Sequence, residues 1–246
     1  MGKTNITRLA VLLGVVGFLA LSAPQAHAAL EIDYSTNGGA TWNFLATGPS
    51  TGPTVYGGGV LGGITVGVTV SSSNSPGTAG LADQFGTNLS LSNSTGSTHA
   101  IWLSFAAQDF TAPTTPPDIN FVSNIGGSVV TGSSANLLSY SSCVDTAKGL
   151  IACPGGSIVA GPVTPSVTFG DGTGHWSAGT QTKITSLTGT YSIGELVEIT
   201  LGAGSEINFS SSSKLTPVPE PMSIALLGGV VLLTSRLIRR KQSHVS

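Results

Sequence analysis

The sequence reads Leu30-Glu-Ile-Asp-Tyr34 near its start and Ile64-Thr-Val-Gly-Val-Thr-Val70 farther along. In both stretches apolar side chains alternate with polar or small ones, which is the period of a strand with one buried face. No window of 11 residues between positions 29 and 216 has convincing helical spacing. The alternation therefore predicts that this part of the 246-residue chain is all-β.

Ten further stretches have the composition of short strands, and clusters of Gly, Ser, Asn and Pro separate them at residues 47–53, 71–80 and 111–118. Many short strands with frequent turns are typical of a two-sheet sandwich or jelly roll. The expected strands are Asn88–Ser92, Ala100–Gln108, Ser128–Thr131, Leu137–Cys143, Ser157–Ala160, Ser166–Phe169, Thr182–Leu187, Thr190–Ile193, Leu196–Leu201 and Glu206–Ser210. The expected core is Ile32, Trp42, Phe44, Val66, Val68, Ile101, Leu103, Phe105, Phe121, Val197, Ile199 and Phe209.

Charge is scarce, and it is unevenly distributed along the chain. Only 8% of the residues are charged, and residues 29–216 hold ten acids, three lysines and no arginine, a net charge of −7. Phosphate recognition normally uses arginine, and nucleic-acid binding needs a positive surface. We therefore expect no nucleic-acid partner and no nucleotide-phosphate site.

The N-terminus has the pattern of a secretory signal peptide. Lys3 and Arg8 precede the apolar run Leu9–Leu21, and Ala26-His-Ala28 has the small residues of a cleavage site. The run is short for a membrane span, so a signal peptide at residues 1–28 is favoured over an N-terminal anchor. Export then requires the Sec translocon and signal peptidase as partners.

The C-terminus carries a motif, an apolar run and a basic tail, in that order. Val218-Pro-Glu-Pro221 precedes an expected transmembrane helix at residues 222–238. That helix is a marginal span at 1.5 Å per residue. The two prolines around Glu220 keep the stretch before it extended. The cations that hold the tail in the cytoplasm by the positive-inside rule are Arg236, Arg239, Arg240 and Lys241.

This composite resembles the PEP-CTERM sorting signal of Gram-negative bacteria, over residues 217–241. The resemblance implies that exosortase, a membrane-embedded thiol enzyme, recognises Val218, Pro219, Glu220 and Pro221 and cuts near them. It also implies a link to exopolysaccharide and biofilm production, and some proteins with this tail are ice-binding. The alternative is a permanent single-pass anchor, with Val218–Pro221 as a stiff stalk.

Two cysteines, Cys143 and Cys153, lie in the exported region. In an oxidising compartment they predict one disulfide that closes a loop flanked by strands. The alternatives are a catalytic thiol or a zinc site, but no histidine lies near the two residues in the sequence.

The densest polar cluster is Phe169-Gly-Asp-Gly-Thr-Gly-His-Trp176, in which Asp171 and His175 are weak candidates for half of a metal or acid-base site. A surface loop is the favoured interpretation, so no metal and no cofactor are expected.

Glycoside hydrolysis would require a pair of carboxylates. The acids considered for such a pair are Glu31, Asp33, Glu195 and Glu198, and all four are expected on the solvent side of their strands.

Residues Ser35–Trp42 resemble the Asp-box hairpin of sialidases, with Asn37 where that motif usually has Asp. The motif is structural in those enzymes, which bind substrate through arginines, so we expect only a β-hairpin here.

Together these features predict an exported, non-enzymatic protein of the cell envelope or the exopolysaccharide matrix. It begins as an inner-membrane-anchored precursor and ends at the cell surface or outside the cell. Two alternatives stay open. A secreted polysaccharide-acting enzyme requires a cleft with two facing carboxylates, and a carbohydrate-binding or ice-binding adhesin requires an ordered platform, for which Thr65 and Thr69 share a face of their expected strand.

Overall fold

The computed structural model describes residues 29–49, 53–67, 69–132, 136–147, 149, 151, 153, 158–160, 166–168 and 174–219. The expected signal peptide, the transmembrane helix, the basic tail, Glu220 and Pro221 lie outside these residues. Within them, no helix is long and apolar enough to cross a membrane.

In the part of the chain that the structure describes, all fifteen regular elements are strands, so the all-β prediction is confirmed there. The first sheet has the order β11–β10–β14–β8–β1–β2, with β12 also paired to β10. Its strands are β1 (Ala29–Ser35), β2 (Asn43–Pro49), β8 (His99–Phe110), β10 (Leu137–Asp145), β11 (Ile158–Ala160), β12 (Ser166–Thr168) and β14 (Tyr191–Leu201).

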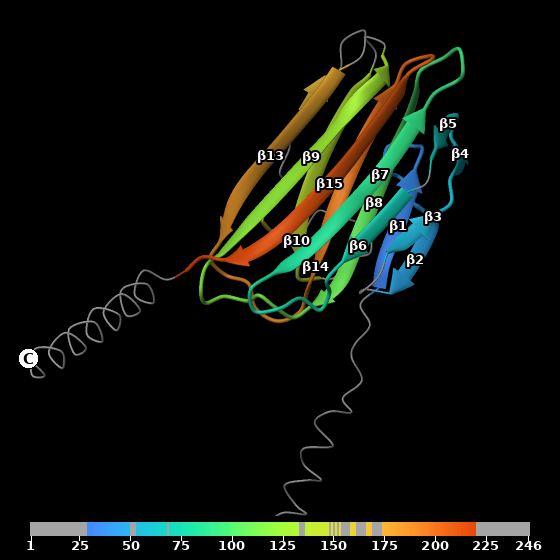
Figure 1. Cartoon of the computed structure of the whole chain (residues 1–246). Coiled ribbons are helices and arrows are strands. Elements are labelled where there is room, and N and C mark those ends of the chain that lie inside the picture. Colours follow the sequence, from blue (N-terminus) through green and yellow to red (C-terminus); the bar gives the residue numbers. More distant parts are fainter. Residues whose placement is uncertain are drawn as a thin grey trace, which may run out of the picture.

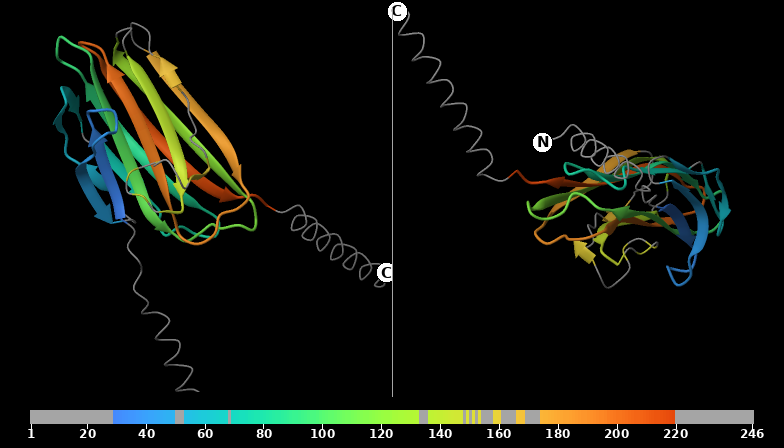
Figure 2. Two further views of the ribbon diagram at one scale, coloured as in Figure 1. Left: turned by 180° about the vertical axis from the view of Figure 1, so that it is seen from behind. Right: turned by 90° about the horizontal axis from the view of Figure 1, so that it is seen from below.

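The second sheet has the order β13–β9–β15–β7–β5–β4, and β6 links β3 to β7. Its strands are β3 (Thr54–Tyr56), β4 (Gly59–Leu61), β5 (Ile64–Val66), β6 (Thr69–Ser73), β7 (Ala82–Ser92), β9 (Ile119–Thr131), β13 (Gly174–Ile184) and β15 (Glu206–Pro217). The two sheets lie face to face as two layers (Figures 1 and 2). Side chains of both sheets form one shared core, for example Ile32 and Phe105 with Leu89 and Ile125.

The shared core has two apolar clusters with polar side chains between them. The larger cluster contains Leu103 and Val197, and the smaller one contains Leu30 and Ile193. Glu195 lies between Val197 and Ile193 on the same face of β14, opposite Phe105 of β8. The middle of the sandwich is therefore polar.

Two residues of the expected core, Trp42 and Phe44, are not buried there. A bulge in the β1–β2 ladder pairs Ile32 with Ala46 but Asp33 with Phe44. The extra residue moves Phe44 to the outer face of the first sheet, where 58% of its surface is exposed. Trp42 is half-buried, and Val68 lies outside the described residues.

The expected single strand Ile64–Val70 is also wrong. It divides into β5 and β6, which both pair with β7, and between them the Gly67 N–H donates to the Ser90 carbonyl at 2.7 Å. Thr65 is exposed on β5, whereas Thr69 on β6 is buried. The two threonines therefore form no platform, and this arrangement contradicts the only feature that favoured ice binding.

The expected hairpin at Ser35–Trp42 joins β1 to β2. Its turn is closed by side chains: Asn37 Oδ1 accepts from the Thr41 N–H at 3.0 Å, and Ser35 Oγ accepts from the Gly39 N–H at 3.0 Å. Gly38 and Gly39 have φ of 71° and 79°, which favours glycine. The hairpin has the structural role that the sequence indicates.

Several strands begin earlier or end later than expected. β2, β3 and β4 lie in sequence that predicts no strand, and β7 and β9 begin well before their alternating halves. β2 and β6 also extend into two of the expected turn clusters, whereas residues 111–118 contain no strand. Glycine and serine in these strands hide the alternation, because the sheet positions tolerate small residues on either face.

Candidate functional site

The disulfide between Cys143 and Cys153 is present, as predicted. It brings Cys153 over the outer face of the first sheet, where its Sγ lies 3.7 Å from the Gly194 carbonyl. Asp145 supports the same loop, because its carboxylate accepts from the N–H groups of Ala147 at 2.8 Å and Gly149 at 3.0 Å. The bond therefore serves to fold a loop back onto the sheet.

The other sites predicted from sequence are described only in part. His175 is exposed at the start of β13, and Asp171 lies outside the described residues. Among the residues that the structure does describe, no three His, Cys, Asp or Glu gather around a possible metal position. Val218 and Pro219 follow β15 directly, and the Val218 N–H donates to the Asp118 carbonyl at 2.7 Å.

Glu195 is not on the solvent side of its strand, so that prediction is wrong. It is 0% exposed, and its Oε2 accepts a hydrogen bond from Ser211 at 2.5 Å across the sandwich. Glu195 and Glu198 are three residues apart, so their side chains lie on opposite faces of the strand. Glu195 lies on the inner face. Burial raises the pKa of Glu195 to about 7, although hydrogen bonds from Ser211, Ser213 and Tyr140 oppose the shift.

Four hydroxyl groups complete this buried polar layer. Ser123 Oγ and Tyr140 Oη are 2.9 Å apart, and Ser213 Oγ lies 3.3 Å from the same tyrosine oxygen. Ser142 donates to Ser123 Oγ at 2.6 Å. Burial also raises the pKa of Tyr140, with a smaller contribution from Glu195. The layer is closed to solvent, so it cannot bind a substrate directly.

Asp33 is likewise not in solvent, although it lies on the outer face as expected. It is 3% exposed, and burial together with the neighbouring Glu31 raises its pKa to about 7. Glu31 and Asp33 are two residues apart on one face of β1, so their side chains point the same way and do not face each other across a cleft, as the two carboxyl groups of a glycoside hydrolase do. Their arrangement does not fit a hydrolytic pair.

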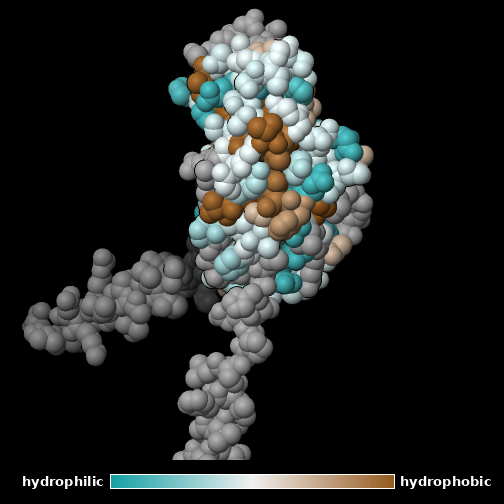
Figure 3. All heavy atoms as spheres, turned by 90° about the vertical axis from the view of Figure 1, so that its right-hand side faces the viewer, coloured by the Kyte–Doolittle hydropathy of each residue, from teal (hydrophilic) through white to brown (hydrophobic). Residues whose placement is uncertain are grey.

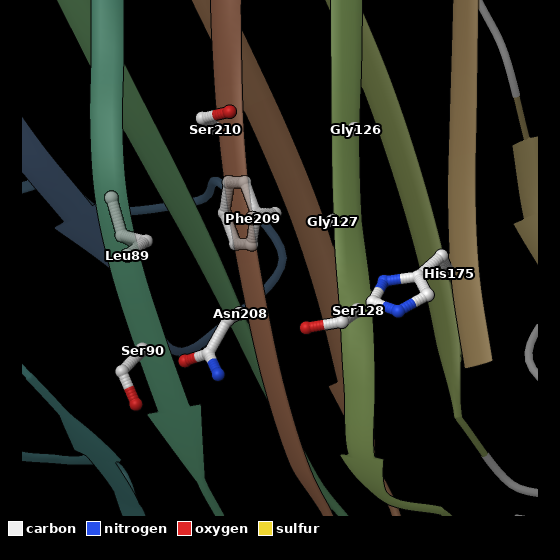
Figure 4. Close-up of a pocket in the computed structure, with 9 residues that line it drawn as sticks. All are labelled: Leu89, Ser90, Gly126, Gly127, Ser128, His175, Asn208, Phe209 and Ser210. Atoms are coloured by element: carbon white, nitrogen blue, oxygen red, sulfur yellow. The ribbon is translucent and has the colours of Figure 1, made fainter. Parts of the chain in front are cut away.

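The outer face of the second sheet carries a groove that the sequence does not predict. Cross-strand pairing places His175, Ser128, Asn208 and Ser90 in one row across β13, β9, β15 and β7. Figure 4 shows these four side chains side by side. The hollow over this row has a volume of about 490 Å³, within the range of about 300–1,000 Å³ that is usual for ligand pockets.

Two glycines of β9, Gly126 and Gly127, lie beneath the hollow. A Cβ at Gly127 would lie 2.1 Å from the Asn208 carbonyl, so no larger residue fits there. Gly126 is different: its Cβ would meet nothing closer than 3.4 Å, so only the missing side chain leaves the space open. The bare backbone of β9 therefore forms the floor.

A second hollow of about 530 Å³ adjoins the first and shares Gly126 and Ser210 with it. Its lining adds an aromatic ring, Phe85, and the polar side chains Asn124 and Ser212. Among the described residues that line the two hollows there is no carboxylate, lysine or arginine. We call the two hollows together the groove. It offers hydroxyls, amides, one imidazole and the ring of Phe85, whereas Phe209, which also lines the first hollow, is only 3% exposed.

Sequence gave a weak signal for this groove. The run Ser210–Ser213 alternates in the strand, so that Ser210 and Ser212 point outward while Ser211 and Ser213 point inward. Assigning the two faces requires the neighbouring strands, because serine is compatible with both. From the sequence, His175 is a candidate only as a partner of Asp171, and no local pattern places it in a groove.

No protein-family model matches the chain, and no curated protein matches it. Among solved structures, it is similar to TmCBM61 in complex with β-1,4-galactotriose, at 11% identity and a TM-score of 0.29, over 58% of this chain and 85% of that one. A chain of infectious bursal disease virus, Gx strain, has 14% identity and a TM-score of 0.35, and the match covers 81% of this chain and 53% of the viral one. The adhesin domain of Epf from Streptococcus pyogenes has 10% identity and a TM-score of 0.31, and the match covers 82% of this chain and 62% of the adhesin domain's chain. The proposals below rest on the geometry of the chain itself.

Proposed function

We propose that this protein is an exported, non-enzymatic component of the cell envelope or extracellular matrix that binds neutral polysaccharide in the groove. The observation that carries the proposal is the lining of the groove, whose described residues are rich in hydrogen-bonding groups and include no charged acid or base. Sugar hydroxyls can exchange hydrogen bonds with serine and asparagine without the desolvation of an ionic group.

The shape of the groove supports a chain-like ligand. Its two hollows follow one another along β9 and β15, and both are open at the surface. Phe85 in the second hollow offers a ring for an apolar sugar face, and Asn124 beside it offers an amide. An open groove holds the middle of a polymer, which suits a matrix component.

The sorting part of the proposal rests on the C-terminal sequence. We propose that exosortase recognises Val218, Pro219, Glu220 and Pro221 after export through the Sec system. Pro217 ends β15, so the motif follows the folded domain immediately. Measuring the mass of the mature protein tests this part. Loss of about 25 residues at the C-terminus is expected in addition to the 28-residue signal peptide, and retention of the full tail would mean a permanent anchor.

Polysaccharide binding is tested by co-sedimentation with the producer's own purified exopolysaccharide. Gly126→Val fills the floor of the groove without a backbone clash, so the bound fraction is expected to fall about tenfold or more, and raising the salt concentration should change wild-type binding little. Gln181→Ala, on the exposed face of β13 outside the groove, is the matched control. Wild-type failure to sediment, or equal binding by Gly126→Val, would exclude the groove as the site.

A further inference from the structure

Three aromatic side chains form a surface on the opposite layer of the sandwich. Cross-strand pairing places Trp102 beside Ser35, and Phe44 beside Asp33, on the outer face of the first sheet. Trp42 lies against Trp102, with ring centroids 6.5 Å apart and planes inclined by 57°. We call Trp42, Phe44 and Trp102 the aromatic surface.

The hairpin holds these rings in place. A Cβ at Gly39 would lie 2.6 Å from the Trp102 ring, so the turn packs directly against the indole. The side-chain hydrogen bonds of Asn37 fix that turn in its conformation. Because the indoles are already ordered by this packing, a ligand that stacks on them loses little additional conformational entropy.

Packing alone does not account for the whole surface. Phe44 is 58% exposed, although it is a large apolar side chain on an ordered strand. Figure 3 looks at the edge that carries β2 to β5, and hydrophobic residues gather on it. An exposed aromatic beside two half-buried indoles is more typical of a contact surface than of a solvated strand.

Polar groups lie next to the rings. Glu198 of β14 is the cross-strand neighbour of Trp102, and Ser139 of β10 is the next neighbour in the same row. Glu198 is half-buried, and burial raises its pKa. A carboxyl group at the edge of an aromatic ring can accept hydrogen bonds from two adjacent hydroxyls while the ring contacts C–H groups.

We propose that the aromatic surface, with Glu198 and Ser139, binds a hexopyranose residue of a neutral glycan. The apolar face of the sugar stacks on the rings, and its hydroxyls donate to Glu198. An anionic glycan does not fit, because Glu31, Asp33 and Glu198 share this outer face and residues 29–216 carry a net charge of −7.

This inference deepens the proposed function, because a glycan site on each layer lets one molecule bridge two polysaccharide chains. The two sites are separable by fluorescence, since the protein has three tryptophans. Trp42 and Trp102 belong to the aromatic surface. Trp176 lies below the groove, where a Cβ at Gly127 would approach its Cζ2 to 2.8 Å.

The experiment titrates the Trp176→Phe protein with cellohexaose and with maltohexaose and follows tryptophan fluorescence. At least one of these neutral probes is expected to shift the emission in a saturable way, whereas hexagalacturonate should not. No saturable shift with either neutral probe would overturn the proposal. The double variant Trp42→Phe/Trp102→Phe, with Trp176 alone, reports groove binding separately, so the two sites can fail independently.

Side-chain variants in the Trp176→Phe background locate the site. Phe44→Ala and Glu198→Gln are each expected to weaken binding of the neutral probe by about tenfold, while the thermal unfolding midpoint changes little. Val60→Ala removes another exposed apolar side chain, 70% exposed on β4, and should leave binding unchanged. If Phe44→Ala binds the neutral probe as well as the Trp176→Phe protein does, the assignment is contradicted. It is also contradicted if the wild type self-associates in sedimentation velocity and Phe44→Ala abolishes this self-association without changing glycan binding.

Discussion

Four consecutive serines on β15, Ser210–Ser213, alternate between the groove and the interior of the sandwich. Ser211 and Ser213 point inward, where they join Glu195, Tyr140 and other hydroxyls in the buried polar layer. Ser210 and Ser212 point outward and line the groove. The same residue type thus closes one polar region and leaves the other open to a ligand.

The two regions differ in whether water can reach their hydroxyl groups. A hydroxyl buried without water must find a partner inside the protein, because an unsatisfied buried group costs roughly 1–3 kcal/mol. A hydroxyl at the surface exchanges water for a ligand at little net cost. Substitutions should therefore affect stability in the buried layer and binding in the groove.

The largest effect is expected for Tyr140→Ala. This change removes a fully buried ring and leaves Ser123 and Ser213 without their shared partner, so it should lower the free energy of unfolding by about 3–5 kcal/mol. Urea denaturation measures the loss. Tyr140→Phe keeps the ring and isolates the hydrogen bonds; if both variants lose the same amount, ring packing contributes nothing and the prediction fails.

Glu195→Gln should change how stability depends on pH. The pKa of Glu195 is about 7 in the folded protein against an ordinary 4.5, so its contribution to stability is fully present below pH 4.5 and is lost as the pH rises through 7. The neutral glutamine avoids this loss and should be more stable than wild type by about 3 kcal/mol above pH 8.

The measurement is the difference between the two proteins in urea denaturation from pH 4 to pH 9. Asp33, whose pKa is also about 7, adds a similar slope to both proteins and cancels in the difference. A difference that stays constant over this range would mean that Glu195 is not held neutral in the core.

Ser211→Ala and Ser210→Ala compare the two regions at adjacent positions. Ser211→Ala removes the hydrogen bond that Glu195 Oε2 accepts at 2.5 Å and should lower the free energy of unfolding by about 1–3 kcal/mol. Ser210→Ala should change it by less than about 0.5 kcal/mol. Thermal and urea unfolding measure the stability of the two variants. Equal losses in the free energy of unfolding would show that the buried and the exposed serine contribute equally to stability.

Asn208→Ala should have the smallest effect on stability, less than about 0.5 kcal/mol, because its side chain lies in the groove. Its effect should be seen in binding, as a several-fold smaller bound fraction in co-sedimentation with the exopolysaccharide. A loss of stability larger than that of Ser211→Ala would place Asn208 in the fold rather than in the ligand site.

The strands with clear alternation were predictable. Leu30–Tyr34, Leu196–Leu201 and most of β8 were expected where they occur, because β-branched and aromatic residues alternate there. β2, β3 and β4 were not, since glycine, threonine and proline dominate their sequence. The disulfide followed from two cysteines in a chain whose N-terminal sequence predicts export.

The candidate site was mostly not predictable. Phe44 was expected inside and is outside, because one bulge reverses the alternation of an edge strand. Glu195 was expected outside and is inside, because its neighbours Ser211 and Tyr140 come from other strands, β15 and β10, which the local pattern of β14 does not encode. The row of His175, Ser128, Asn208 and Ser90 unites four strands whose order no local pattern encodes.

The sequence by itself determined the all-β class, the acidic and arginine-free character of residues 29–216 and the pairing of Cys143 with Cys153. These properties depend on composition and on local periodicity, which are written along the chain. Only the tertiary structure decided which serines and carboxyl groups face water, because serine fits either face of a sheet and a carboxyl group can be buried when other strands supply its donors.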